Sequence, residues 1–283
     1  MKTVLITGAS GGIGKALVSR FTRAGWKVIA CDRSGDGLRV DVTDENSIRA
    51  ARQTVGVPDV LINNAGIGLL GPIAELPDEI FAKQFDVNVR GIARMVRAFA
   101  PGMCERGQGR IVNVSSLAGV TSLPWFGAYA ASKHAVEAVS DAMRLELAPF
   151  GVKVAIVEPS IVHPTPSPQG ALVGTGFVDA AIESLEKSAP NSRWETALRN
   201  TVARRDSFLP ITVTPERVAE AVFHAATARF PRTRYRVGWL ASLLIRGQAF
   251  LPTFLTDAIM RAMVGLTRPK TQNALPSTSL ETR

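Results

Sequence analysis

A tyrosine and a lysine stand four residues apart in the segment AYAASKHAV, residues 128–136. If this segment is helical, the two side chains lie on one face, one turn apart. A phenol has an ordinary pKa of about 10 and is a weak base at neutral pH, but a cation within about 4–6 Å favours its ionised form. We therefore interpret Tyr129 as a candidate general acid/base whose pKa is lowered by Lys133.

A glycine-rich segment, TGASGGIG, directly follows a short β-branched run and opens a helical pattern. The glycines that define its spacing are Gly8, Gly12 and Gly14. Glycines at such a point let the backbone turn tightly and approach a pyrophosphate at the positive end of a helix. The phosphate loop of ATPases is disfavoured, because Ala9 and Ala16 stand where that motif needs a glycine and a hydroxyl residue. The segment predicts a nucleotide site, and a plain glycine-rich turn is the alternative.

Short strand patterns alternate with helical patterns over most of the chain. Strands are predicted at 3–7, 27–32, 39–42, 60–66, 110–116, 152–159 and 233–238, and helices at 15–25, 78–106 and 127–148. Short apolar strands separated by helices indicate a parallel sheet covered on both faces, the doubly wound α/β class. Ligands of this class bind at the carboxyl ends of the strands.

Composition and charge exclude several other classes of protein. The chain has 283 residues, of which 46% are apolar and 20% charged, as in soluble globular proteins. Its two cysteines, Cys31 and Cys104, make neither a disulfide framework nor a zinc site, so we expect a cytoplasmic protein without metal. Residues 191–283 carry 14 basic against 6 acidic side chains and account for most of the net charge of +9. We expect a solvated basic surface there, with a weak membrane-surface contact as the alternative and no nucleic acid.

Five motifs occur together in a fixed order. They are TGASGGIG after the first strand, NNAG at 63–66, Asn88 in DVNVRG, Ser116 thirteen positions before Tyr129, and Lys133. This set resembles the short-chain dehydrogenase/reductase family over roughly residues 3–165, and weakly as far as the strand at 233–238. The resemblance implies one Rossmann-type domain with about seven strands. It also implies hydride transfer between a nicotinamide cofactor and an alcohol or carbonyl.

The resemblance assigns roles to four side chains. Tyr129 is the acid/base, Lys133 lowers its pKa and also holds the nicotinamide ribose, and Ser116 hydrogen-bonds the substrate oxygen. Asn88 steadies a water that relays protons through Lys133. Ser115 is a rival for Ser116, but the thirteen-residue spacing favours Ser116.

Cofactor choice is expected at the end of the second strand. Asp32 can accept both ribose hydroxyls and repel a 2′-phosphate, whereas Arg33 could attract one. Gly11 stands where relatives that prefer NADP often carry a basic residue, so we predict NAD(H), with NADP(H) as the alternative. The resemblance assigns further cofactor contacts to Gly8, Ser10, Gly12, Ile13, Gly14, Asp41, Val42, Asn64, Ala65, Gly66, Pro159 and Val162. A turn or helix N-terminal role is the alternative for Asp41.

The segment EPSIVHPTPSPQG departs from the family pattern. Ser160 replaces a common glycine, and Pro164 stands near an expected threonine, a role that Thr165 could take one position later. We interpret His163 as a loop-lining residue. Residues 160–210 are expected to form a lid whose apolar residues, with Leu123, Trp125 and Phe126, indicate a hydrophobic alcohol or ketone substrate.

The C-terminal third completes the prediction. Residues 1–240 are assigned to the domain with its lid, 241–268 to a helical extension, and 269–283 to a disordered tail. The segment FPRTRYRVGWLASLL resembles family members that act on steroids, retinoids or other lipophilic alcohols. The first residues lack the pattern of a secretory signal, and a homodimer or homotetramer built on the helices at 78–106 and 127–148 is expected. The alternative to an oxidoreductase is a cofactor-binding regulatory or interaction protein on the same fold.

Overall fold

The computed structural model describes residues 1–162, 165–166, 172–173, 183–187, 190, 192–204, 212–239, 243 and 250–266. Within these ranges the chain forms a seven-stranded sheet in the order β3-β2-β1-β4-β5-β6-β9, with every pair parallel. The strands are β1 (Thr3–Thr7), β2 (Lys27–Asp32), β3 (Leu38–Arg39), β4 (Val60–Asn63), β5 (Gly109–Val114), β6 (Val152–Pro159) and β9 (Arg234–Val237). The predicted doubly wound fold is confirmed.

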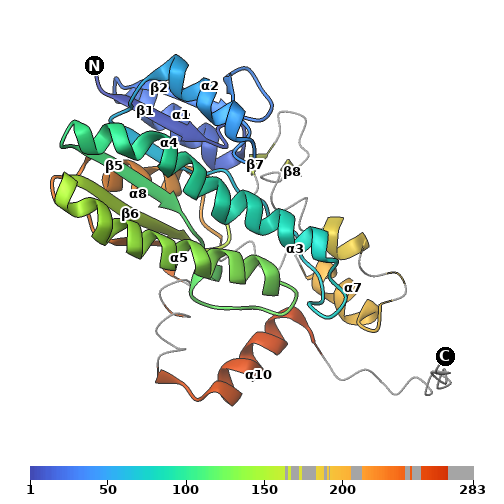
Figure 1. Cartoon of the computed structure of the whole chain (residues 1–283). Coiled ribbons are helices and arrows are strands. Elements are labelled where there is room, and N and C mark those ends of the chain that lie inside the picture. Colours follow the sequence, from blue (N-terminus) through green and yellow to red (C-terminus); the bar gives the residue numbers. More distant parts are fainter. Residues whose placement is uncertain are drawn as a thin grey trace, which may run out of the picture.

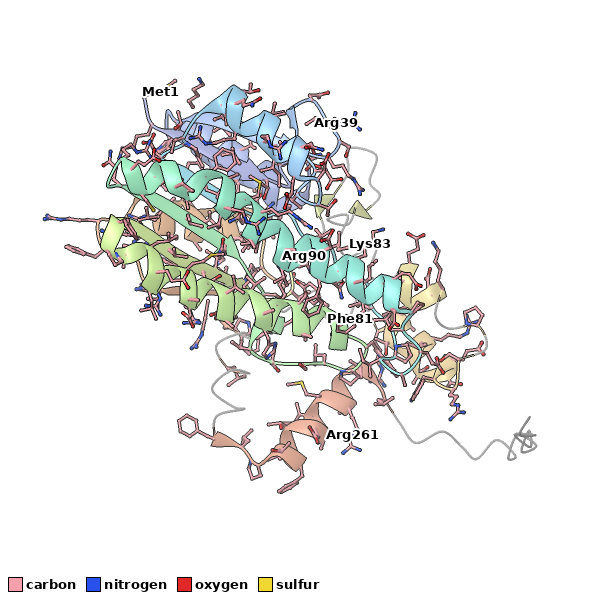
Figure 2. All side chains as sticks on the ribbon, in the orientation of Figure 1. Met1, Arg39, Phe81, Lys83, Arg90 and Arg261 are labelled. Atoms are coloured by element: carbon pink, nitrogen blue, oxygen red, sulfur yellow. The ribbon has the colours of Figure 1, made fainter. Side chains whose placement is uncertain are left out.

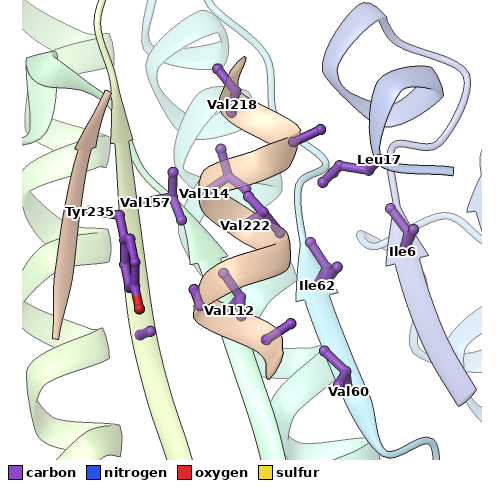
Figure 3. Close-up of a cluster of buried hydrophobic side chains, with 14 of the residues drawn as sticks. Ile6, Leu17, Val60, Ile62, Val112, Val114, Val157, Val218, Val222 and Tyr235 are labelled. Atoms are coloured by element: carbon purple, nitrogen blue, oxygen red, sulfur yellow. The ribbon is translucent and has the colours of Figure 1, made fainter. Parts of the chain in front are cut away.

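Helices cover both faces of this sheet (Figure 1). They are α1 (Gly12–Arg23) and α8 (Pro215–Thr227) on one face, and α2 (Glu45–Val55), α4 (Gly91–Glu105) and α5 (Gly127–Leu147) on the other. Successive residues of a strand point to opposite faces. Accordingly, Ile6 packs with Leu17 of α1 and Val222 of α8 (Figure 3), whereas Leu5 packs with Phe99 of α4 on the opposite face.

Strand β3 is reached from β2 by a loop of only five residues, 33–37. Parallel neighbours usually need a crossover of about a dozen residues or more. Here β3 has two residues and pairs only with the last two of β2, Cys31 with Leu38 and Asp32 with Arg39. The predicted strand at 39–42 is therefore shorter than expected. The loop folds back over the glycine-rich segment, where the Ser10 hydroxyl donates to the Ser34 carbonyl oxygen at 2.8 Å.

The helix predicted at 78–106 is continuous but not uniform. It consists of α3 (Asp78–Phe85), a π-helical turn at Asp86–Arg90 and α4. Figure 2 shows the side chains of Phe81, Lys83 and Arg90 along this helix. A π turn inserts one residue into the α-helical repeat, and such turns are frequent at functional sites. Asn88 lies within it and is fully buried.

The C-terminal part adds helices away from the sheet (Figure 1). These are α7 (Glu195–Ala203) and α10 (Thr253–Val264), linked where the Thr201 hydroxyl donates to the Val264 carbonyl oxygen at 2.9 Å. The helical extension predicted at 241–268 is thus helical over 253–264, and the predicted tail at 269–283 lies outside the described residues. No helix in the described ranges is long and apolar enough to cross a membrane.

Candidate active site

Helix α5 places Tyr129 and Lys133 one turn apart, as predicted, with the lysine Nζ 5.9 Å from the centre of the phenol ring. Both side chains are buried, at 6% exposure each. Trp125, just before the helix, has a φ of +72°. This conformation is strained for a bulky residue, and such strain gathers at functional sites.

Ser116 follows β5 and lies beside the phenol. Burial raises the pKa of Tyr129 to about 12, and the hydrogen bond with Ser116 opposes this increase. The Ser116 oxygen also accepts from the Ala118 amide at 3.1 Å, as the cap of a 3₁₀ turn at Leu117–Gly119. Ser115 faces this turn instead, because a Cβ on Gly119 would lie 2.7 Å from its hydroxyl. Of the two serines, Ser116 is the one beside Tyr129.

Lys133 is fixed by the end of β5. Its Nζ donates to the Val114 carbonyl oxygen at 2.9 Å. Burial lowers the pKa of Lys133 to about 8, against a smaller opposing effect of the Glu137 carboxylate. We expected Lys133 to lower the pKa of Tyr129, but the phenol pKa is raised in this structure. The reason is that burial of the phenol outweighs the stabilising contacts of its ionised form.

Asn88 connects the π turn to the loop after β4. Its Oδ1 accepts from the Ile67 amide at 2.8 Å, and its Nδ2 donates to the Ile67 carbonyl oxygen at 2.9 Å and to the Ser132 hydroxyl at 3.0 Å. Ser132 in turn donates to the Tyr129 carbonyl oxygen at 2.7 Å. A Cβ on Gly66 would lie 3.3 Å from Asn88 Oδ1 and 3.7 Å from Lys133 Nζ, so both groups face Gly66.

Sequence reasoning missed Ser132 and Glu137. Ser132 is fully buried and Glu137 is 7% exposed. A serine that precedes the lysine and a glutamate four positions after it are common on helices. Only their burial sets them apart, and the sequence does not carry that signal.

The glycine-rich segment has the shape that a pyrophosphate needs. Helix α1 begins at Gly12, and no side chain accepts a hydrogen bond from its first backbone amides. These amides can therefore bind an anion. A Cβ on Gly14 would collide with the Gly8 carbonyl oxygen and lie 2.7 Å from Ala9 Cα. Gly8 has a φ of +66°, and its Cβ would lie 2.8 Å from Ala65 Cα. These residues fit the phosphates of a dinucleotide.

Asp32 stands where a ribose-binding carboxylate is expected, at the end of β2. Its Oδ2 accepts from the Ser10 amide at 2.8 Å, and its Oδ1 accepts from the Ser34 amide at 3.3 Å. The carboxylate thus joins the glycine-rich segment to the 33–37 loop. Arg33 is exposed beside it.

Asp41 and Asn64 make mainly structural contacts here. Asp41 Oδ1 accepts from the Thr43 amide at 2.8 Å and from its hydroxyl at 2.7 Å, which is the turn role named above as the alternative. Burial raises the pKa of Asp41, but these hydrogen bonds outweigh it and hold the pKa below its ordinary value. Asn64 Nδ2 donates to the Thr7 and Gly8 carbonyl oxygens, both at 3.0 Å, and so ties β1 to β4. Val42 is buried at 8% exposure.

The structure describes only part of the segment that follows β6. Pro159 is the last residue of β6, and the Ser160 amide donates to the Val237 carbonyl oxygen at 2.9 Å. Val162 forms an isolated parallel bridge with Val213. The expectations for His163 and Pro164 lie outside the described residues. Thr165 begins a two-residue strand, β7 (Thr165–Pro166), which pairs with β8 (Leu172–Val173).

An apolar wall surrounds the phenol on the side of the expected lid. Tyr129 packs in one cluster with Leu70, Trp125, Leu185 and Leu198. The Trp125 indole donates to the Thr201 hydroxyl at 2.9 Å, and the Ser184 hydroxyl donates to the Leu70 carbonyl oxygen at 2.6 Å. A separate cavity of about 520 Å³ has a mixed lining of apolar and charged residues, which are Leu69, Glu75, Leu76, Pro77, Ile80, Glu183, Ser184, Lys187, Pro190 and Ser192.

Comparison with known proteins agrees with this geometry. Residues 2–171 match the family model for short chain dehydrogenases. The chain belongs to the short-chain dehydrogenase/reductase family. Its human relative retinol dehydrogenase 16 is 35% identical over 92% of this chain and 87% of its own length. Human 17-beta-hydroxysteroid dehydrogenase type 1 is 34% identical over 82% of this chain and 76% of its own.

A solved short-chain dehydrogenase from Streptomyces avermitilis has the same fold. It superposes with a TM-score of 0.70 at 28% identity, over 93% of this chain and 97% of the other. As a short-chain dehydrogenase/reductase, the protein is an oxidoreductase that uses a nicotinamide cofactor.

Proposed function

We propose that this short-chain dehydrogenase/reductase transfers a hydride between NAD(H) and a lipophilic secondary alcohol or ketone, with Tyr129 as acid/base. The observation that carries the proposal is the group of three side chains that the end of β5 and the first turns of α5 bring together. Ser116 hydrogen-bonds the Tyr129 phenol, and Lys133 lies one turn further along α5, with its Nζ 5.9 Å from the ring. The glycine-rich start of α1 opens at the same edge of the sheet.

Each side chain has a defined task in this reaction. The nicotinamide, when bound, accepts or gives the hydride and in its oxidised form brings a positive charge to the site. Ser116 donates to the substrate oxygen, and Tyr129 takes the hydroxyl proton during oxidation or returns it during reduction. Lys133 favours the ionised phenol and binds the nicotinamide ribose. Asn88 keeps the 64–67 loop against Lys133, and a proton-relay water is proposed beside it.

The apolar surroundings of Tyr129 support a lipophilic substrate. The phenol packs in an apolar cluster with Leu70, Trp125, Leu185 and Leu198. Burial of apolar substrate area against such a surface is favourable by about 25 cal/mol per Å². Two relatives are named for acting on retinol and on a hydroxysteroid. An alcohol of that size and polarity is the substrate class that we infer.

The cofactor preference rests on Asp32. A carboxylate held at the end of β2 by the Ser10 and Ser34 amides can accept from the ribose hydroxyls and repels a 2′-phosphate. Among the other cofactor contacts, Gly8, Gly14 and Ala65 are supported by close backbone approach. For Asp41 and Asn64, we propose that the cofactor is contacted by the polar atoms that do not take part in their structural hydrogen bonds.

The remaining proposals concern organisation. We assign residues 1–240 to one domain with its lid, in the cytoplasm, and propose a homodimer or homotetramer built on α4 and α5. Exposed apolar side chains gather on and before α10, with Phe250 at 86% and Phe254 at 73% exposure. Together with the basic Arg261, which lies further along α10 (Figure 2), they fit weak contact with an anionic lipid surface. Light scattering and co-sedimentation with anionic vesicles test these two proposals.

The function is tested by a panel of secondary alcohols and ketones of increasing apolar size, with NAD(H) and NADP(H) in parallel. Formation or loss of the reduced nicotinamide is followed by absorbance. We expect Tyr129→Phe to lower turnover by about 10²–10⁴-fold, the usual contribution of a general acid/base, with nearly unchanged NADH affinity. Retained turnover in this variant would refute the mechanism. Stoichiometric NADH binding without turnover in the wild type would instead support the cofactor-binding regulatory protein.

A further inference from the structure

The loop that follows β4 obtains its hydrogen-bond partners from side chains. Residues 64–71 form neither helix nor strand, so their backbone groups need other partners where they are buried. Asn88 supplies both partners of Ile67. Gln84, four residues earlier in the same long helix, does the same for Leu69. Its Oε1 accepts from the Leu69 amide at 2.6 Å, and its Nε2 donates to the Leu69 carbonyl oxygen at 3.3 Å.

Gln84 uses both ends of its amide on this one residue. The side chain is fully buried, and a buried amide is costly unless its donor and its acceptor are both bonded. An apolar residue of similar size would avoid this cost, but it would leave Leu69 without these two bonds. The contact with the loop therefore explains why a glutamine stands at this buried position.

The next two residues of the loop are held from other parts of the chain. Ser184, in the helical segment 183–187, accepts from the Leu70 amide at 3.1 Å and donates to the Leu70 carbonyl oxygen at 2.6 Å. The Gly71 amide donates to the Trp125 carbonyl oxygen at 3.0 Å. Hydrogen bonds from the long helix, from segment 183–187 and from the residues before α5 thus fix three consecutive loop residues.

Packing supports this loop on one side more than on the other. Leu70 is 3% exposed and belongs to the apolar cluster of Tyr129 and Leu185. Leu69 and Ser184, in contrast, line the cavity of about 520 Å³. Atoms that border a cavity lack contacts on that side. Hydrogen bonds must therefore resist a shift of the loop toward the cavity, and Gln84 supplies two of them.

We propose that Gln84 is a positioning residue that determines substrate specificity, because together with Ser184 it fixes Leu70 in the apolar surface beside Tyr129. The proposal rests on the function proposed above, since it takes this surface as the one that receives the apolar part of the substrate. A large apolar alcohol gains contact area from a fixed Leu70, whereas a small alcohol that does not reach Leu70 gains none. Gln84 thus acts on the choice among alcohols and not on proton transfer.

Substitution of Gln84 by methionine tests this role. Gln84→Met keeps the length and the apolar contacts of the side chain and removes both hydrogen bonds to the loop. We measure kcat/KM with NAD for a series of secondary alcohols of increasing apolar size. The ratio of kcat/KM for the largest to that for the smallest alcohol should fall by about tenfold, which is the effect of roughly one methylene group in an apolar pocket. The change should appear in KM, with kcat for the smallest alcohol and the Kd of NADH near those of the wild type.

Three further variants separate positioning from a general loss of stability. Ser184→Ala should lower the same ratio, because it removes the other contact that holds Leu70. Ser140→Ala removes a buried hydroxyl on α5 that accepts from Asn113 Nδ2 at 2.8 Å, and it should lower stability without changing the ratio. In a Leu70→Ala background, Gln84→Met should have no further effect on the ratio, because the side chain that it positions is absent.

The outcomes distinguish this proposal from the proposed function. A folded Gln84→Met enzyme with the wild-type ratio, an equal loss for small and large alcohols, or an undiminished effect in the Leu70→Ala background overturns the positioning role. If Gln84→Met does not fold, Ser184→Ala, alone and with Leu70→Ala, decides the question in the same way.

Binding measurements cover the case in which no turnover is found. A wild type that binds these alcohols in the presence of NADH but turns none of them over overturns the proposed function. Calorimetric affinities of the NADH-loaded enzyme for the same series then test Gln84→Met, with the same expected fall in the ratio. A wild type whose affinity does not rise with the apolar size of the alcohol overturns both proposals.

Discussion

Replacing Lys133 by methionine should remove activity and also a free-energy penalty for burying an ammonium. Lys133 is 6% exposed, and burial lowers its pKa from 10.5 to about 8. At about 1.4 kcal/mol per pH unit, this corresponds to about 3 kcal/mol against the folded state at neutral pH. The unfolded chain binds more protons between about pH 8 and 10.5. The wild type should therefore gain stability as the pH rises through this window.

The methionine variant lacks that gain. At pH 7 it escapes the penalty but loses the hydrogen bond to the Val114 carbonyl oxygen, which costs about 1–3 kcal/mol. We expect a net stabilisation of about 1 kcal/mol at pH 7. Between pH 7 and pH 10.5, the free energy of unfolding of the wild type should rise by about 3 kcal/mol relative to that of Lys133→Met.

Urea unfolding at several pH values from 7 to 10.5 measures this difference. Lys153→Met is the matched control, because Lys153 is exposed and its Nζ also donates to a carbonyl oxygen, that of Arg229, at 2.7 Å. The same series on Lys153→Met gives the effect of losing an exposed lysine together with its hydrogen bond to a carbonyl oxygen. A difference between Lys133→Met and the wild type that does not vary with pH would refute the reasoning, since burial of charge would then not be what perturbs Lys133.

Three further substitutions test other parts of the site. Asp32→Ala should narrow the ratio of kcat/KM for NAD over NADP, and an unchanged ratio would show that the preference rests on another residue. Gly14→Ala should weaken NADH binding at least tenfold and destabilise the fold by about 1–3 kcal/mol, because the new Cβ overlaps the Gly8 carbonyl. Calorimetric titration measures the affinity and thermal unfolding measures the stability. An affinity equal to that of the wild type would contradict the close approach of Gly14 to Gly8. Thr201→Val should cost about 1–3 kcal/mol in urea unfolding by leaving the buried Trp125 indole unpaired, and an effect below 0.5 kcal/mol would count against this link to α7.

Local patterns predicted most of the sheet and the acid/base pair. The strands at 3–7, 27–32 and 152–159 agree with β1, β2 and β6 to the residue, because β-branched runs bounded by turns leave little freedom. The four-residue separation of Tyr129 and Lys133 was enough to predict that they lie on one helical face, since α5 is an uninterrupted helix. Helical repeat and strand alternation are local, and a single sequence contains them.

Long-range contacts explain what could not be predicted. Arg234 and Glu137 are 97 residues apart in the chain. They come into contact because β9 pairs with β6 at the edge of the sheet. The direction of the Tyr129 pKa also depends on burial, which forms only when α7 and residues 183–187 cover the phenol. Of the lid expected at 160–210, residues 163–164, 167–171, 174–182, 188–189, 191 and 205–210 lie outside the described residues.

The π turn at Asp86–Arg90 means that the long helix is two separately oriented segments. One extra residue rotates all later side chains by about 100° relative to an unbroken α-helix. The apolar stripe of α4, which includes Met95, Phe99 and Met103, is therefore aimed at the sheet independently of α3. A single-codon deletion in 86–90 would convert the π turn into an α turn, so that α3 and α4 keep their faces while Asn88 loses the position in which it binds Ile67 and Ser132. What the extra residue provides is therefore the placement of Asn88, which neither a deletion there nor a substitution of that residue would preserve.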